Sequence, residues 1–178
     1  MKFTLITSIC LTMLLALGSS HAWDPKGLEK DKANVQVTVD RLLEADPSMQ
    51  RFFDAASGYV VIPSVAKGGM GIGGARGKGL LYEKGEATAE VTMTQLSFGL
   101  QAGGQAYSEF IFFEDEKALE RFKDGNFELG AQASAIAIKK GISVDIAYED
   151  GVAIFTQAKG GLMYEAAVSG QKFNVKLL

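Results

Sequence analysis

A glycine-rich segment in the first half of the chain sets the strongest limit on how this sequence can fold. Residues 67–79 read KGGMGIGGARGKG, which is seven glycines in thirteen positions with three basic residues among them. Glycine has no side chain and therefore permits turns and close backbone approaches that other residues resist. The segment can be a phosphate-binding loop, a flexible linker, or a strand that lies against another part of the backbone.

The residues on either side of the segment do not fit a phosphate-binding loop. Gly69, Gly71 and Gly74 fit the spacing GxGxxG, but that fingerprint needs a strand before it and a helix after it to hold the pyrophosphate. Pro63 is expected to end the preceding strand early, and the residues that follow, GLLYEKGEATAEV, show no helical periodicity. The Ser or Thr that completes a Walker A motif is missing after Lys78. We expect no nucleotide binding.

The linker interpretation fails on composition. A flexible linker is rich in Gly and Ser and separates two domains, whereas this segment contains Met70, Ile72 and Ala75 and continues directly into Leu80 and Leu81. Glycine inside a strand usually marks a bulge or a close backbone approach. We therefore interpret residues 67–79 as a strand, or a strand pair, whose missing side chains let another element lie against it.

The N-terminus has the pattern of a secretory signal peptide. Lys2 precedes an apolar run from Phe3 to Leu17, and small residues, Ser20 and Ala22, occupy the −3 and −1 positions of a cleavage site. We expect a signal peptide at residues 1–22 and one domain at 23–178. The protein would be exported and periplasmic, either free or peripheral on a membrane. An uncleaved N-terminal anchor is the alternative.

Cleavage would also remove most catalytic chemistry. The only cysteine, Cys10, and the only histidine, His21, would leave with the leader, which excludes thiol nucleophiles, Ser-His-Asp triads and the usual zinc sets. We expect no cofactor, no metal and no enzymatic activity. A hydrolase with two carboxylates is the less favoured alternative, and its candidate acids are Glu109, Asp115, Asp145, Glu149 and Glu165. With 18 basic and 21 acidic side chains, the chain also lacks the positive charge typical of nucleic-acid binding.

The periodicities predict a single α+β domain, mostly antiparallel sheet, with two N-terminal helices and one internal helix. Residues 23–46 form a helical lead-in, and Asp46-Pro47 reads as the cap and first residue of a second helix that ends at Gly58. The internal helix is expected at 114–123. In the tail, four strands separated by glycine-containing turns predict a β-meander, with the sequences ISVDIAY, VAIFTQA, LMYEAAV and KFNVKLL.

Three sequence blocks resemble the SYLF domain family. They read YVVIPSVAKGGMGIGGARGKG, TQLSFGLQAGGQAYSEFIFF and GLMYEAAVSGQKF, and the likeness runs from about Pro47 to Phe173. The resemblance implies lipid binding: eukaryotic members bind phosphoinositides, and some also bind and bundle actin. Bacterial members similar to this chain are exported proteins of poorly defined role.

A lipid-binding protein needs cations for the phosphate of a headgroup, and several are available in this sequence. The glycine-rich segment offers Lys67, Arg76 and Lys78 beside the backbone N–H groups of Gly68 and Gly69. Further candidates are Lys139, Lys140 and Lys159. The expected partner is an anionic phospholipid surface. The alternative is a structural or interaction module that binds an envelope protein through its exposed sheet or apolar helix.

Overall fold

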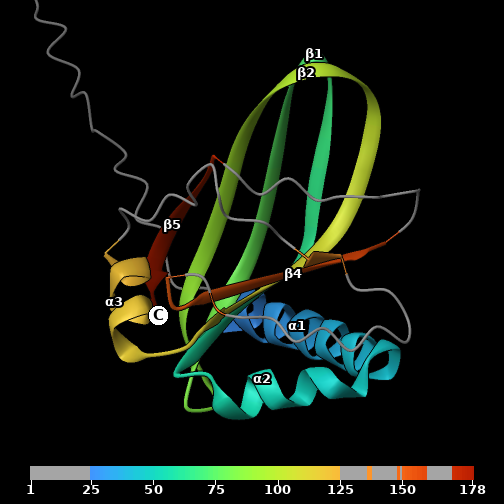
Figure 1. The fold of residues 1–178 in the computed structure, drawn as a ribbon. Helices are drawn as coiled ribbons and strands as arrows, with labels where there is room; N and C mark the ends of the chain where they lie inside the picture. Colours follow the sequence, from blue (N-terminus) through green and yellow to red (C-terminus); the bar gives the residue numbers. More distant parts are fainter. Residues whose placement is uncertain (1–24, 125–135, 138–147, 149, 160–169) are drawn as a thin grey trace, which may run out of the picture.

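The fold is α+β, as predicted, with helices packed around a single, mostly antiparallel sheet (Figure 1). The computed structural model describes residues 25–124, 136–137, 148, 150–159 and 170–178. The expected signal peptide, residues 1–22, lies outside this set, so its boundary stays a prediction. Within the described part of the chain, no helix has the length and hydropathy needed to cross a bilayer.

Helix boundaries follow the capping signals of the sequence. Helix α1 spans Pro25–Ala45, a 3₁₀ turn spans Pro47–Met49, and α2 spans Gln50–Ala55. The side chain of Asp46 accepts a hydrogen bond from the Ser48 N–H at 3.0 Å, and this confirms the predicted cap before Pro47.

The predicted internal helix is also present. Helix α3 spans Glu116–Lys123, and Asp115 caps it by accepting a bond from the Ala118 N–H at 2.7 Å. The helix thus begins two residues after the first position of the predicted range, because Asp115 serves as its cap.

Two unusually long strands, β1 (Gly58–Glu83) and β2 (Glu86–Phe113), form one antiparallel hairpin. Lys84 and Gly85 connect them with φ values of 51° and 84°. Positive φ at both central residues is the geometry of tight two-residue hairpin turns, where a flexible residue such as glycine is favoured. The glycine-rich segment therefore lies inside a strand and is followed by a strand, which removes the basis for a dinucleotide site.

The expectation that Pro63 ends its strand is wrong. β1 continues through Pro63, with a register shift between Ile62 and Val65. Among the described strands β1 pairs only with β2, so it is an edge strand. Proline is tolerated at an edge or bulge because its missing N–H breaks no ladder bond there.

The hairpin folds back on itself, and Figure 1 shows β1 and β2 rising together, bending at the top and descending. One half of the bent hairpin contains residues 58–68 and 105–113 and pairs with β4 (Val152–Ala158). The other half contains residues 73–83 and 86–95 and pairs with β5 (Gln171–Leu177). We call these halves the first layer and the second layer.

The predicted four-strand meander is only partly described. Strands β4 and β5 match two of its members, but both pair with β2. The short strand β3 (Ile136–Ala137) runs parallel to β4. Of the other two expected strands, residues 142–147 and 162–168 lie outside the described residues.

Apolar side chains on both faces of the first layer are buried in two clusters, because neighbouring residues of a strand point to opposite faces. The inner cluster lies between the layers and is closed by α3. The outer cluster lies under α1 and α2. Its largest members form a set of aromatic contacts, including Phe52 with Phe112 at 5.5 Å and Phe52 with Phe155 at 4.8 Å between ring centroids.

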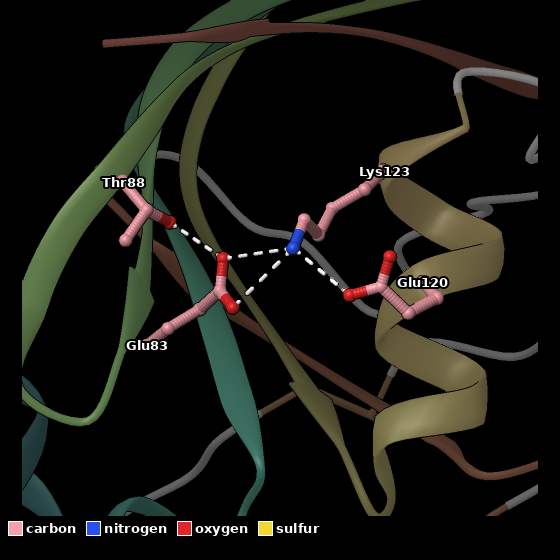
Figure 2. Close-up of polar contacts among 4 residues, drawn as sticks. All are labelled: Glu83, Thr88, Glu120 and Lys123. Atoms are coloured by element: carbon pink, nitrogen blue, oxygen red, sulfur yellow. Dashed lines mark hydrogen bonds and ion pairs between the residues drawn. The ribbon is translucent and has the colours of Figure 1, made fainter.

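Polar contacts tie α3 to the turn of the long hairpin (Figure 2). Lys123 Nζ lies 3.3 Å from Glu83 Oε1 and 2.9 Å from Glu120 Oε1. The hydroxyl of Thr88 donates to the same Glu83 oxygen at 2.8 Å. Since Glu83 and Thr88 lie on opposite sides of the turn, this network joins β1, β2 and α3.

Candidate functional site

A cleft of about 500 Å³ lies between α1 and two parts of β1. This volume is in the range of small-molecule sites. We call it the α1–β1 cleft. Its lining comes from α1, from the part of β1 near the register shift, and from the end of the glycine-rich segment: Asp31, Asn34, Val35, Pro63, Ser64, Ala66, Arg76, Gly77, Lys78, Gly79 and Leu80.

Two glycines allow the parts of β1 to meet at this cleft. A Cβ at Gly77 would stand 2.6 Å from Ile62 Cγ2 and 2.9 Å from Val65 Cγ2, and one at Gly79 would overlap the carbonyl oxygen of Val61. Cβ atoms essentially never approach other heavy atoms this closely. The interpretation of the glycine segment as a strand that another element packs against is therefore confirmed, and the other element is an earlier part of the same strand.

The alternation of side chains along β1 places the two cations on one face of the strand. Arg76 and Lys78 alternate with Gly77 and Gly79, so they share one face of the strand with Leu80. Leu80 is buried in the outer cluster under α1, whereas Arg76 and Lys78 are exposed. The strand therefore presents two neighbouring positive charges on the face that turns toward α1.

The opposite wall of the cleft contributes polar groups from α1. Asp31 and Asn34 are exposed, one helical turn apart, and Val35 beneath them is buried. Among the described residues, no ion pair involves Arg76 or Lys78. Both cations are therefore available to an anionic group, and Asp31 is the acidic side chain of the cleft lining.

The other predicted site residues are not brought into the cleft. Lys67 is half-buried and Gly68 is exposed, and the lining includes their neighbour Ala66 but neither of them. Gly69 pairs with Gly103 farther along the hairpin. Lys139 and Lys140 lie outside the described residues.

Lys159 lies beside Arg41 instead. Partial burial, and then the positive charge of Arg41, lower the pKa of Lys159 below its usual value. Gln157, two residues earlier, donates to the Arg41 carbonyl at 3.4 Å. Arg41 is outside the cleft lining, so Lys159 and Arg41 form a second basic position at the other end of α1.

Sequence reasoning missed the contributions of α1 and of Ser64. Asp31, Asn34 and Val35 have the i, i+3, i+4 spacing of one helix face, so the sequence did place them together. Nothing local showed that this face meets β1, because the contact joins residues far apart in the chain. Ser64 follows a proline that was expected to end its strand.

The carboxylates considered for catalysis have other roles or are not described. Asp115 caps α3. Glu109 is fully buried between the layers and accepts a hydrogen bond from Gln171 Nε2 at 3.0 Å. Asp145, Glu149 and Glu165 lie outside the described residues. Among the residues that the structure does describe, no three His, Cys, Asp or Glu side chains gather in a group fit for a metal ion.

Glu109 is nevertheless unusual, because it is a carboxyl in an apolar interior. Burial raises its pKa from 4.5 to about 7, while the Gln171 bond acts in the opposite direction. Burial, and secondly the charge of Glu109, also raise the pKa of Tyr107. Thr156, the cross-strand partner of Glu109 in β4, is buried too. The Gln171 bond joins the first layer to β5 of the second layer.

Comparison with known proteins shows which family and which relative the chain is similar to. Residues 94–176 match the Ysc84 family, described as "Las17-binding protein actin regulator". The chain is also similar to Beta cell expansion factor A of Aeromonas veronii, with 27% identity over 156 residues that cover 84% of this chain. The aligned region covers 59% of that relative's length. The resemblance found in the sequence is thereby confirmed over residues 94–176, the part of the chain that matches the Ysc84 (SYLF) family model.

Proposed function

We propose that this protein is a non-enzymatic lipid-binding protein of the cell envelope that docks on anionic phospholipid through the α1–β1 cleft. SYLF domains are linked to lipid binding, and the leader predicted at residues 1–22 supports export. The observation that carries the proposal is the position of Arg76 and Lys78, which are exposed at a cleft of headgroup size without an ion-pair partner among the described residues.

The residue types of the cleft suit a phosphate headgroup. The guanidinium of Arg76 can bind two phosphate oxygens at once, while Lys78 supplies a point charge. Asn34 and Ser64 line the same cleft and can donate or accept hydrogen bonds. A basic residue near an anionic membrane surface contributes roughly 1 kcal/mol, so Arg76 and Lys78 together would contribute about 2 kcal/mol.

Vesicle flotation of residues 23–178 tests the proposal. The protein is mixed with vesicles of phosphatidylglycerol or cardiolipin, and with phosphatidylcholine vesicles for comparison, at low and at high salt. We expect flotation with the anionic vesicles only, weakened by salt because the attraction is screened. Replacing both Arg76 and Lys78 by Ala should weaken binding roughly 30-fold, the equivalent of about 2 kcal/mol.

A matched control separates a site from general charge. Lys117 on α3 and Lys176 on β5 are exposed and lie outside the cleft lining. The Lys117→Ala/Lys176→Ala variant removes the same total charge and should bind like the wild type. Equal losses in the two double variants would show diffuse attraction without a site, and no flotation in any mixture would reject lipid binding.

The second candidate is a protein-interaction module. It is favoured by the free edge of β1, which pairs only with β2 among the described strands, and an unpaired strand edge can accept an added strand. The description of the matched family also names a protein partner. Binding that ignores lipid charge and survives high salt would support this alternative.

A further inference from the structure

Ile62 connects the buried carboxyl of Glu109 with the α1–β1 cleft. Ile62 and Glu109 are direct cross-strand partners, so their side chains lie on the same, inner face of the first layer. Ile62 Cγ2 also approaches to 2.6 Å the point where a Cβ of Gly77 would stand. Gly77 lies between Arg76 and Lys78 in the cleft lining. Ile62 is therefore a neighbour both of Glu109 across the sheet and of the segment that carries the cleft's cations.

The register shift of β1 gives a second connection. It falls between Ile62 and Val65, and the residues inside it, Pro63 and Ser64, belong to the cleft lining. The carbonyl of Pro63 accepts a hydrogen bond from the hydroxyl of Ser108 at 2.9 Å. Since Ser108 is the neighbour of Glu109 in β2, this bond links β2 at Glu109 to this wall of the cleft.

The surroundings of Glu109 offer little to compensate a negative charge. Facing groups are Tyr107 from β2, Thr156 from β4 and Gln171 from β5, none of them a cation. On β1, Val65 faces the inner cluster, and Lys67, two positions later, lies on the same face of the strand. Lys67 is half-buried. In the described part of the chain, Glu109 Oε1, Thr156 Oγ1 and Gln171 Oε1 are buried without a hydrogen-bond partner. Ionisation adds a charge that this interior can accommodate only by rearranging.

We propose that the ionisation state of Glu109 regulates the α1–β1 cleft, with the neutral carboxyl favouring a phosphate headgroup and the ionised carboxylate weakening its binding. The inference rests on the proposed function. An ionised Glu109 repels an anion held by Arg76 and Lys78 and loosens the packing of Ile62 against Gly77. The burial that raises the pKa of Glu109 to about 7 brings this change into the neutral range.

Linkage makes the regulation reciprocal. If proton binding at Glu109 favours the headgroup, headgroup binding must favour the proton at Glu109 by the same factor. A protein that starts at Trp23 lacks His21, the only histidine of the chain, and its α-amino group titrates alike in the wild type and in Glu109→Gln, so the comparison of these two proteins assigns the pH response to Glu109. Phosphatidylglycerol is a suitable probe, since its phosphodiester does not titrate near neutrality.

The experiment measures binding of residues 23–178 to phosphatidylglycerol vesicles between about pH 5.5 and about pH 8.5, a range that brackets neutrality. The wild type should bind about fivefold more weakly at the upper end, the low end of typical coupling between sites. The Glu109→Gln variant, which keeps the size and neutrality of the protonated acid, should not show this loss. An equal loss in both proteins would overturn the proposal.

A lipid-free measurement separates this idea from the proposed function. Amide NMR signals of residues 76–80 should titrate with a midpoint near 7 in the wild type and stay constant in Glu109→Gln. If vesicles never bind, the proposed function fails, and this titration alone decides whether Glu109 acts on the cleft. If Glu109→Gln does not fold, the titration of wild-type Glu109 is followed directly through its carboxyl ¹³C signal. A titration midpoint that rises when short-chain phosphatidylglycerol is added supports the proposal, and an unchanged midpoint refutes it.

Discussion

Gly79 lies directly against the main chain of Val61, although both belong to the same strand. A Cβ at position 79 would overlap the Val61 carbonyl oxygen and stand 2.8 Å from the Cα of Ile62. Only a residue without a side chain fits there, because a backbone cannot move aside as a flexible side chain can. The contact brings two parts of β1 together beside the α1–β1 cleft, whose lining includes Gly79.

Gly79→Ala should destabilise the protein strongly, by about 1–3 kcal/mol or more, as overpacking of a filled interior does. Gly74→Ala is the matched control, since its Cβ would meet only the Gln95 carbonyl at 3.4 Å and alanine is no worse than glycine in a strand. Urea unfolding of the two variants checks the prediction. Equal stability of both variants would show that the close approach at Gly79 is not needed.

Stability should fall as pH rises from about 4.5 to about 7 through the contribution of Glu109. The folded state holds the Glu109 proton up to about pH 7, whereas the unfolded chain releases it near 4.5. Between these values the folded state binds more protons, so raising the pH favours unfolding, by about 3 kcal/mol in total. Below 4.5 and above 7 this contribution is constant.

Glu109→Gln should remove that slope and be the more stable protein at alkaline pH. Denaturant unfolding of the wild type and the variant over this pH range isolates the contribution, because the other acids titrate alike in both. Parallel stability curves would contradict the assignment of the buried carboxyl.

Lys123→Met should loosen α3 from the hairpin turn by about 1 kcal/mol, the upper end for ion pairs near a surface. The variant breaks the contacts of Lys123 with Glu83 and Glu120 shown in Figure 2. Lys117→Met on the exposed side of the same helix is the control and should be neutral. Hydrogen exchange of the α3 amides measures the effect. Equal protection in both variants would show that the Lys123 contacts do not stabilise the packing of α3 against the hairpin turn.

Asp31→Asn should tighten binding to anionic vesicles by roughly fivefold, since removal of one like charge at the cleft is worth about 1 kcal/mol. Asp40→Asn is the control on the same helix, because Asp40 is exposed and outside the cleft lining. Flotation at low salt compares the two variants. A similar gain in both would mean that only net charge matters.

The elements of this fold were largely readable in the sequence because their signals are local. Asp46 with Pro47 marked a helix start, and the recurring glycines marked a strand under close approach. The prediction from Pro63 was wrong, because a proline ends a strand inside a sheet but is tolerated in an edge strand. Whether a strand lies at an edge is a property of the whole sheet.

The site was only half predictable for the same reason. Arg76 and Lys78 were found because they lie within the glycine segment, next to the residues that shape it. Asp31 joins them through the packing of α1 on β1, and Lys159 is held elsewhere, beside Arg41. Such contacts join distant parts of the chain, and no local pattern encodes them.

The most direct test of the cleft is amide NMR mapping of residues 23–178 titrated with soluble, short-chain phosphatidylglycerol. Signals from Asn34, from 64–66 and from 76–80 should shift together and saturate, and the Arg76→Ala/Lys78→Ala variant should lose the response. Shifts centred on Arg41 and Lys159, with the cleft signals unchanged, would contradict the assignment of the α1–β1 cleft as the headgroup site.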